Sequence, residues 1–232
     1  MAQLTFAWFA AAAFAVSMGY FLFAYLFLFT RALSVSADAT RAPLLFNFAL
    51  FTLFALHHSL LARTAAKDLV RSIVPTPLER AVYTLVASVL FFVVCWLWRP
   101  LPGVAWTLEP PWRWLGYGAQ VAGFVLTIAG ARALDIWELS GVRQASKRPS
   151  KPSILQTGGL YGVVRHPLYF AWVLFVFGAP EMTLTRLSFA AISTLYLALA
   201  IPFEERSLIE TFGPDYASYR MKVRLRMMPG IY

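Results

Sequence analysis

The chain has 232 residues, of which 59% are hydrophobic and only 13% are charged. This balance excludes an ordinary soluble domain, because the apolar residues form long blocks and a membrane span needs about 20 of them in a row. The net charge of +9 does not indicate a nucleic-acid partner, because the basic residues fall between the apolar blocks.

Six apolar blocks predict an all-α fold, a polytopic membrane helical bundle of about six spans in one domain of residues 1–232. The N-terminal spans occupy 1–131, and most of the polar motifs fall in 132–232. The first block lacks the basic leader and the cleavage site of a signal peptide, so we interpret it as a retained span. The fifth is short and could be completed by the residues before Pro167. The blocks cover residues 4–29, 43–61, 78–98, 112–131, 167–180 and 186–203.

The basic residues predict how the spans are oriented. Most of the 20 Lys and Arg residues lie in 62–80, in 132–166 and after 203, which six spans place on one side. The positive-inside rule then puts these segments and both termini in the cytoplasm, with the bundle in the cytoplasmic membrane. An odd number of spans would divide the basic segments between the two sides.

The second and third spans carry a few polar or reactive side chains. His57 and His58 lie late in the second span, where a histidine is a functional candidate by default. A hydrogen bond between helices would explain such a histidine equally well. Cys95, in the third span, is the only cysteine, which excludes a disulfide framework and a cysteine-based metal site.

The segments between the spans give weaker signals. Residues 62–80, "ARTAAKDLVRSIVPTPLER", predict a short amphipathic surface helix that ends at Pro75 and Pro77. Residues 99–114, "RPLPGVAWTLEPPWRW", predict an irregular outer loop whose tryptophans lie at the membrane interface. The tail after 203 predicts two short interfacial helices, because apolar residues recur there at helical spacing on either side of Gly213.

Charged residues stand at the ends of the last two spans, which is unusual for a membrane helix. Arg165 carries a planar fork of donors suited to a carboxylate, and His166 can donate or accept a hydrogen bond near neutral pH. Pro167 suits the first turn of a helix, whose N–H groups favour an anion. Glu204 and Glu205 diverge by about 100° on one helix, so we expect one to point inward and the other to flank a basic residue or the lipid headgroups.

Four tyrosines accompany these charges and complete a set of partners for a zwitterionic ligand with a carboxylate, an amine, a ribose and a flat base. Anchoring in lipid headgroups is the alternative for the charged residues before the fifth span and after the sixth. We favour it for Lys222, Arg224 and Arg226, because polybasic segments next to a membrane bind anionic lipid. The four tyrosines are Tyr161, Tyr169, Tyr216 and Tyr219.

The segment "GGLYGVVRHPLYFAW" (158–172), followed by "EERSLIETFGPDYASYRMKV" (204–223), resembles the isoprenylcysteine carboxyl methyltransferase-like superfamily. Its members are integral-membrane methyltransferases that use S-adenosylmethionine. The similarity is greatest to the branch that methylates methanethiol, and it covers most of the chain from about Leu53. Further matching motifs are "LFALHHSLLAR", "WRP", "ELSGVRQ" and "PEMTLTRLSFA".

The resemblance implies a cofactor pocket for S-adenosylmethionine, built with the cytoplasmic interfacial helices. Two positions depart from the family pattern: Arg224 stands where a proline is usual, and Ser140 where the thiol-methylating branch tends to have an aromatic residue. The residues implied for the pocket are Tyr161, Gly162, Arg165, His166, Tyr169 and Glu205, with Glu204, Tyr216 and Tyr219 nearby.

The resemblance also implies a reaction, the transfer of a methyl group to a small thiol, with methanethiol giving dimethyl sulfide. A prenylcysteine carboxylate and a phospholipid amine are the alternative acceptors within this class of enzyme. Because the thiolate is the nucleophile, we expect His58 to assist deprotonation or to orient the acceptor, with Glu138 and Arg143 as further catalytic candidates. Ion pairing within the loop is the alternative for Glu138 and Arg143.

A function from another class has less support. A heme- or quinone-associated membrane subunit would use histidines in the spans as ligands, and the chain has only three histidines. A small transporter is disfavoured because no inverted repeat is visible. The expected partners are therefore a small hydrophobic or thiol substrate and membrane lipid, with no nucleic acid, no metal and no obligate protein partner.

Overall fold

The computed structural model of the chain describes residues 1–31, 40–61, 72–133, 137, 140–146 and 154–232. The chain forms two compact units built from interleaved segments. The first comprises Met1–Val104, Asp135–Lys151 and Thr183–Arg186, and the second comprises Ala105–Leu134, Pro152–Met182 and Leu187–Tyr232. The single domain expected from the sequence stays a prediction.

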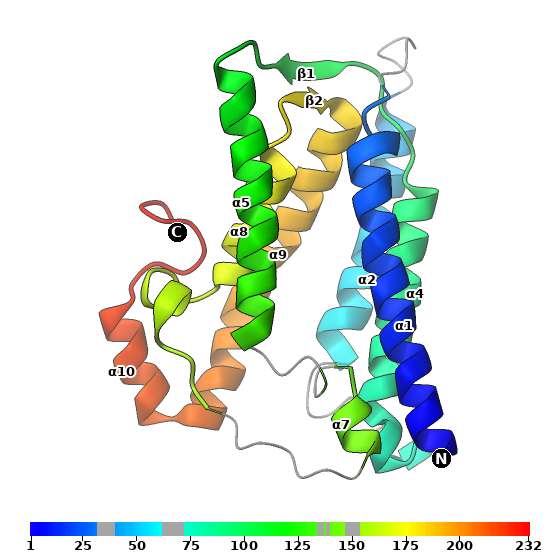
Figure 1. The fold of residues 1–232 in the computed structure, drawn as a ribbon, viewed down its shortest axis with the longest axis vertical. Helices are drawn as coiled ribbons and strands as arrows, with labels where there is room; N and C mark the ends of the chain where they lie inside the picture. The colour runs from blue at the N-terminus through cyan, green and yellow to red at the C-terminus, as the bar shows by residue number, and fades with distance from the viewer. Residues whose placement is uncertain (32–39, 62–71, 134–136, 138–139, 147–153) are drawn as a thin grey trace. The chain divides into compact units, whose positions relative to one another are not determined.

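The described part of the chain is mostly helical (Figure 1). The long helices are α1 (Ala2–Phe23, extended by the π-helical turn Ala24–Leu28), α2 (Arg41–Leu61), α4 (Glu79–Leu97), α5 (Trp112–Ala133) and α9 (Leu184–Phe212). The shorter helical elements are the 3-10 turns Thr76–Leu78 and Gly159–Gly162, and the helices α7 (Val142–Ala145), α8 (Pro167–Phe177) and α10 (Pro214–Lys222).

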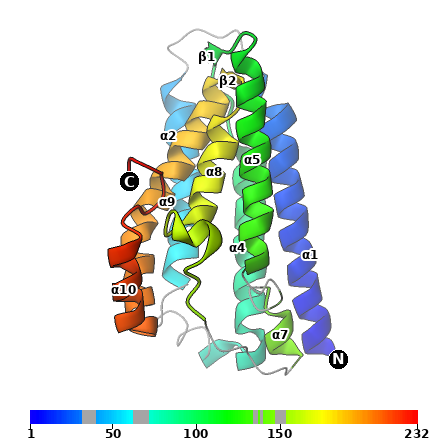
Figure 2. The same cartoon turned by 60° about the vertical axis from the view of Figure 1, so that its left-hand side comes forward.

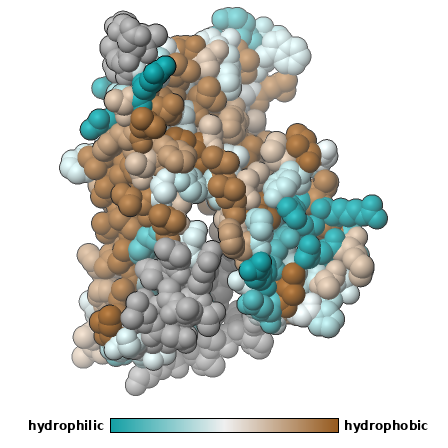
Figure 3. Space-filling model, turned by 180° about the vertical axis from the view of Figure 1, so that it is seen from behind, coloured by the Kyte–Doolittle hydropathy of each residue, from teal (hydrophilic) through white to brown (hydrophobic). Residues whose placement is uncertain are grey.

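Five of the helices are long and apolar enough to cross a membrane, which confirms the predicted all-α, polytopic bundle. Most of their side chains are not buried by the protein itself, as expected of helices whose outer surface faces lipid. Hydrophobic side chains accordingly cover much of the visible helical surface in Figure 3. The chain is therefore an integral membrane protein. The candidate spans are Ala2–Leu28, Arg41–Ser59, Thr76–Leu97, Trp112–Ala131 and Leu184–Phe212.

The fifth apolar block forms a helix too short to cross the bilayer by itself, although Leu168 lies against Gly130 near the end of α5 and Pro180 against Gly116 near its start. Helix α8 has 11 residues, or about 16 Å at 1.5 Å per residue, against roughly 30 Å of hydrocarbon. The residues before Pro167 do not lengthen it, because they pair with the tail: the N–H groups of Arg165 and His166 donate to the carbonyl oxygens of Leu225 and Arg226, over 3.0 and 2.8 Å. Pro167 begins the helix, as predicted.

The sixth block is longer than predicted. Helix α9 continues through Pro202 to Phe212, so Glu204 and Glu205 belong to this helix. The prediction of two short tail helices was wrong for the first of them, which is the end of α9. The break comes at Gly213, whose φ of +53° belongs to the left-handed region, and Pro214 then opens α10.

In the first unit, α1 and α2 pack against α4. Aromatic side chains fill the contact, with the rings of Phe21 and Phe91 5.6 Å apart and those of Tyr20 and Phe92 4.5 Å apart. Arg186 is buried and donates to the carbonyl oxygens of Tyr25 and Leu26 over 3.1 and 3.2 Å. Its charge is therefore directed at the π-helical end of the first span, whose carbonyls need donors.

In the second unit, α5 and α8 lie side by side (Figures 1 and 2). A Cβ atom on Gly123 would lie 2.6 Å from both the carbonyl oxygen of Ala171 and the nitrogen of Phe175, so glycine lets the two backbones approach closely. The segment before α5 also contains β1 (Val104–Thr107), which pairs with β2 (Glu181–Thr183). The sequence predicted no strand here.

The amphipathic helix predicted in the first basic segment falls mostly on residues outside the described part of the chain. Pro75 and Pro77 are described, and the 3-10 turn Thr76–Leu78 leads from them directly into α4.

Candidate functional site

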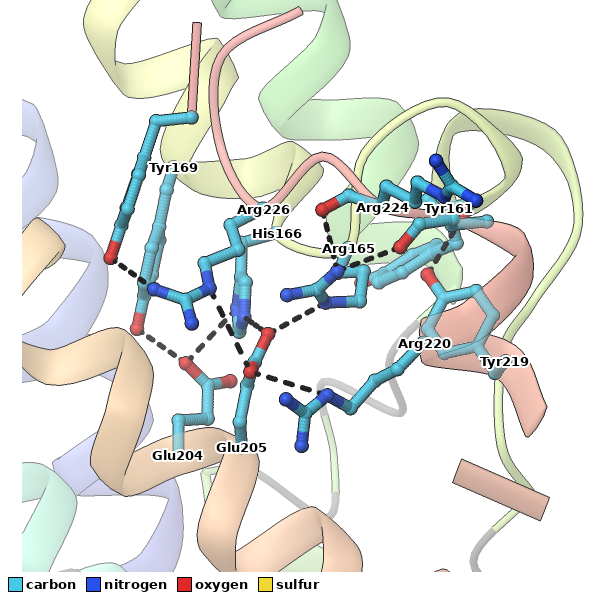
Figure 4. Close-up of polar contacts among 12 residues, drawn as sticks. Tyr161, Arg165, His166, Tyr169, Glu204, Glu205, Tyr219, Arg220, Arg224 and Arg226 are labelled. Carbon is cyan, nitrogen blue, oxygen red and sulfur yellow. Dashed lines mark hydrogen bonds and ion pairs between the residues drawn. The ribbon is translucent and has the colours of Figure 1, made fainter. Parts of the chain in front are cut away.

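The charged residues singled out by the sequence come together in the second unit (Figure 4). Arg165 and His166 lie just before α8, held by the backbone pairing with the tail. Glu204 and Glu205 project from α9, where the continuation past Pro202 keeps them on a regular helix. The arrangement therefore depends on three segments that are far apart in the sequence.

Arg165 and Glu205 form the centre of the site. The Arg165 Nε donates to the Glu205 Oε1 over 2.6 Å, and each side chain is only 4% exposed. The Arg165 Nη1 also donates to the carbonyl oxygens of Val223 and Arg224, over 2.7 and 2.8 Å. Because a buried charge needs a partner, this pair fixes α9 to the segment before α8 and to the tail.

His166 lies between the two carboxylates. Its Nδ1 is 3.3 Å from the Glu204 Oε2, and its Nε2 is 3.5 Å from the Glu205 Oε1. The Tyr169 ring stacks on the imidazole with centroids 5.3 Å apart, and the Tyr169 hydroxyl donates to the Glu204 Oε2 over 2.8 Å. Glu205 is buried and Glu204 exposed, as the expected divergence requires, yet both contact the same imidazole.

Two further arginines approach Glu205 from the tail. The Nε atoms of Arg220 and Arg226 lie 3.7 and 3.9 Å from the Glu205 Oε2. From the sequence we expected Arg226 to anchor in lipid headgroups and expected no role for Arg220. The position of Arg220 could have been found from its spacing. It lies four residues after Tyr216, so the two side chains are on the same face of α10.

The two tail tyrosines are buried but differ in their hydroxyl groups. The Tyr219 hydroxyl donates to the carbonyl oxygen of Tyr161 over 2.6 Å and so ties α10 to the turn before α8. The buried hydroxyl of Tyr216 has no hydrogen-bond partner among the described residues. Burial raises the pKa of both phenols to about 12, and the negative charge of Glu205 adds to the shift.

Tyr161 and Gly162 belong to the 3-10 turn Gly159–Gly162. Burial raises the pKa of the Tyr161 phenol, and the charge of Glu204 raises it further. A Cβ atom on Gly162 would make only an ordinary contact, 3.6 Å from the carbonyl oxygen of Thr157. The left-handed backbone of this turn is at Gly159, with φ +58°, so the steric requirement for glycine falls there.

A groove of about 680 Å³ opens beside these residues in the second unit. Four arginines line it together with apolar side chains of α10 and the tail. The lining residues are Arg165, Ala217, Arg220, Met221, Arg224, Leu225, Arg226, Ile231 and Tyr232.

The predicted catalytic residues lie elsewhere in the chain. His58 is on α2 of the first unit, where its Nδ1 is 2.9 Å from the hydroxyl of Tyr83 on α4. The helix–helix hydrogen bond considered for this histidine is thus present. Arg143 is on α7, also in the first unit, and Glu138 lies outside the described residues. The catalytic roles of these three residues stay predictions.

Comparison with known proteins gives the family. No family model and no solved structure matches the chain. It is 37% identical over 204 residues to a methanethiol S-methyltransferase of Pseudomonas deceptionensis, covering 81% of this chain and 75% of the relative. Methanethiol S-methyltransferase 1 of Bradyrhizobium diazoefficiens is 35% identical, with 81% and 67% covered. A Nurim homolog of Drosophila melanogaster is 26% identical, with 72% and 70% covered. The chain therefore belongs to the methanethiol S-methyltransferase family, within the superfamily that its motifs resemble.

Proposed function

We propose that the protein is a membrane methyltransferase that transfers a methyl group from S-adenosylmethionine to a small thiol, converting methanethiol to dimethyl sulfide. The similarity to relatives named methanethiol S-methyltransferase, over four fifths of this chain, carries the proposal. It rests on more than one motif, because the matched region covers 204 residues.

The residues before α8 and on α9 and α10 fit the methyl donor by their chemistry. The donor carries an ammonium, a sulfonium, a carboxylate and a nucleoside. Glu204 is a partly exposed carboxylate that suits the cationic groups. The Tyr216 hydroxyl is a buried polar group without a partner in the described part of the chain, and such groups are rare unless a ligand or water satisfies them. When bound, the donor supplies a methyl group already activated on a positively charged sulfur.

The protein residues would bind and orient the reactants rather than form a covalent bond. Glu204, whose side chain is 45% exposed, favours a cationic ligand near His166 electrostatically. Tyr161 and Tyr169 offer aromatic faces for a flat base. Holding two reactants in line and excluding water lowers the barrier by up to about 7–11 kcal/mol in the best intramolecular cases.

A thiol acceptor must lose its proton, and His58 is our candidate to take it. The Tyr83 hydroxyl donates its single proton to the backbone carbonyl of His58 over 3.1 Å. The phenol oxygen can then accept a hydrogen bond from the Nδ1–H of His58, 2.9 Å away. In this tautomer, Nε2 of His58 carries the lone pair that accepts the thiol proton.

The experiment is an assay of the purified protein in neutral detergent with methyl-labelled S-adenosylmethionine. Methanethiol, a prenylcysteine and a phosphatidylethanolamine are offered separately, and the labelled product and S-adenosylhomocysteine are both measured. We expect labelled dimethyl sulfide in equal amount to S-adenosylhomocysteine. Glu204→Gln should slow the reaction, whereas Glu109→Gln, an exposed carboxylate before α5, should not. Labelling of the prenylcysteine or the lipid alone would refute a thiol acceptor, and no labelled product from any acceptor would refute the enzyme class.

The orientation is also a proposal: both termini and the basic segments face the cytoplasm, in the cytoplasmic membrane. It rests on the positive-inside rule and on the segment from Leu168 to Pro180, which follows α5 from Gly130 to Gly116 and so returns the chain to the level where α5 begins. Reporter enzymes fused after Tyr232 and inserted between Gly103 and Val104 should be active on opposite sides of the membrane.

A further inference from the structure

Three arginines of α10 and the tail reach the same groove as Arg165. Arg220 comes from α10, and Arg224 and Arg226 come from the segment that follows it. Figure 4 shows Arg220 and Arg226 beside Glu205, with the Arg224 side chain directed away from it, and Figure 3 shows hydrophilic side chains gathered over α10 and the tail. The groove therefore concentrates positive charge from two parts of the chain.

The acidic residues nearby do not neutralise this charge. Glu205 is buried and already accepts a 2.6 Å hydrogen bond from Arg165. Arg220 and Arg226 stay 3.7 and 3.9 Å from Glu205, beyond hydrogen-bond distance. No carboxylate in the described part of the chain contacts the guanidinium of Arg224. The residues that line the groove include four arginines and no Asp or Glu, and Arg165, Arg220 and Arg226 share the single charge of Glu205.

The arginines are held in place before any ligand arrives. The backbone that carries Arg224 and Arg226 is fixed by hydrogen bonds from Arg165, both from its Nη1 and from its backbone N–H. The Arg226 guanidinium stacks over the Tyr232 ring, 5.1 Å from the centroid, and its Nη1 donates to the Tyr232 hydroxyl over 2.8 Å. A preorganised guanidinium loses less entropy when it binds an anion.

We propose that this groove is a binding site for a phosphate-bearing anion, distinct in charge from the methyl donor. Planar guanidinium groups match phosphate oxygens in pairs, and several of them together bind phosphate strongly. The proposed function assigns the methyl donor to Glu204, Tyr216 and the rings of Tyr161 and Tyr169, and none of these residues lines the groove. The inference therefore does not depend on that function.

Two sources would supply the same chemistry, the headgroup of an anionic lipid and a free phosphate ester. The apolar side chains at the groove favour the lipid. Met221 and Ile231 line it and are 72% and 76% exposed, so a lipid chain lying against them would cover surface that water otherwise contacts. The surrounding membrane supplies both the anionic headgroup and the acyl chain of such a lipid.

The test measures the unfolding temperature of the whole protein in a neutral detergent during four titrations: phosphatidylglycerol, phosphatidylcholine, glycerol phosphate and inorganic phosphate. Two variants are compared with the unaltered protein. One is the single variant Arg224→Gln, and the other is the double variant that combines Arg220→Gln with Arg224→Gln. The control is Arg113→Gln, which removes an exposed arginine near the start of α5. Methyl transfer is not measured, so the outcome is independent of the acceptor and the donor.

We expect phosphatidylglycerol to raise the unfolding temperature of the unaltered protein and of Arg113→Gln, while phosphatidylcholine does not. The double variant should need at least about tenfold more phosphatidylglycerol for the same shift, because two charge-assisted contacts are lost. An equal, variant-sensitive shift with glycerol phosphate or inorganic phosphate would support the site and assign it to a free phosphate. Equal lipid responses in all variants, or no response to any anion, would overturn the proposal. If the double variant does not fold, Arg224→Gln alone decides, since its guanidinium contacts no carboxylate in the described chain.

Discussion

Arg165 and Glu205 are 40 positions apart in the sequence and form an ion pair in which both side chains are 4% exposed. Two carbonyl oxygens of the tail complete the coordination of the arginine. One buried contact thus holds the segment before α8, the end of α9 and the residues after α10. Loss of Glu205 would leave the buried Arg165 charge without its carboxylate partner.

The first prediction follows from this pair. Glu205→Ala should lower the free energy of unfolding by roughly 3–5 kcal/mol, because the Arg165 charge stays buried without its partner. Replacing both residues, as in Arg165→Met with Glu205→Leu, should be less destabilising than Glu205→Ala. Denaturant unfolding in detergent, followed by tryptophan fluorescence, measures both changes. Glu109→Ala breaks an exposed 3.8 Å pair with Arg113 and should change stability by less than about 1 kcal/mol. A small effect of Glu205→Ala would mean that the pair does not hold these segments together.

The second prediction compares the two tail tyrosines. Tyr219→Phe removes the hydrogen bond to the Tyr161 carbonyl and should destabilise the protein by about 0.5–1.5 kcal/mol. Tyr216→Phe removes a hydroxyl without a partner in the described chain, so stability should be unchanged or slightly higher. Calorimetric titration with S-adenosylhomocysteine should instead show weaker binding for Tyr216→Phe, by about fivefold to tenfold. Unaltered affinity in Tyr216→Phe would remove this hydroxyl from the proposed donor site.

The third prediction concerns alkaline pH. Burial raises the pKa of Tyr216 and Tyr219 to about 12, above the value of about 10 for a tyrosine in an unfolded chain. The folded state therefore holds these protons when the unfolded state has lost them, and the unfolding free energy falls as pH rises from 10 to 12. Below pH 10 this contribution is fully present. The double variant Tyr216→Phe with Tyr219→Phe should lose less unfolding free energy between pH 10 and 12 than the unaltered protein. An equal loss in both proteins would contradict the raised pKa values.

The membrane-spanning helices and the polar cluster were predictable from the sequence because their signals are local. Long apolar blocks define the spans, and the charged residues at their ends are visible as exceptions. The continuation of α9 past residue 203 to Phe212 was not predictable, because the apolar run that defines the span ends there and charged residues follow. The pairing of β1 with β2 joins segments about 75 residues apart, and no local pattern in either segment signals the other.

Within the site, too, some features were predictable from the sequence and others were not. Arg165, His166 and Glu205 were recognisable by residue type and position, whereas the approach of Arg220 and Arg226 to Glu205 depends on how the tail folds back. The backbone hydrogen bonds of Arg165 and His166 with the tail decide that path. Such pairing leaves no trace in the side chains of residues 223–226, so the sequence predicted headgroup anchoring for Arg224 and Arg226 but not their position beside Arg165.

The fourth prediction tests the close approach of α5 and α8. Gly123→Ala would place a methyl group 2.6 Å from backbone atoms of α8, so the helices must separate, at a cost of about 1–3 kcal/mol. Gly118→Ala, on the same helix, meets no atom within 4 Å and should stabilise the protein by up to about 1 kcal/mol through helix propensity. Thermal unfolding of the two variants measures the difference. Equal and favourable effects would show that α5 and α8 are not in close contact.

The fifth prediction separates a base from a structural histidine at His58. If His58 accepts the thiol proton, His58→Gln should lower turnover of methanethiol by about 100-fold or more, the usual scale of general-base catalysis. An aromatic thiol is largely ionised at neutral pH, so the same variant should lose much less activity with benzenethiol. Raising the pH should restore the methanethiol reaction in the variant, because solvent then supplies the thiolate. Tyr83→Phe removes the hydroxyl at Nδ1 of His58 but keeps the imidazole. Its turnover should therefore fall less than that of His58→Gln, and the fall should differ between the two thiols. Equal losses with both thiols at every pH would mean that His58 only joins α2 to α4, as its hydrogen bond with Tyr83 by itself would explain.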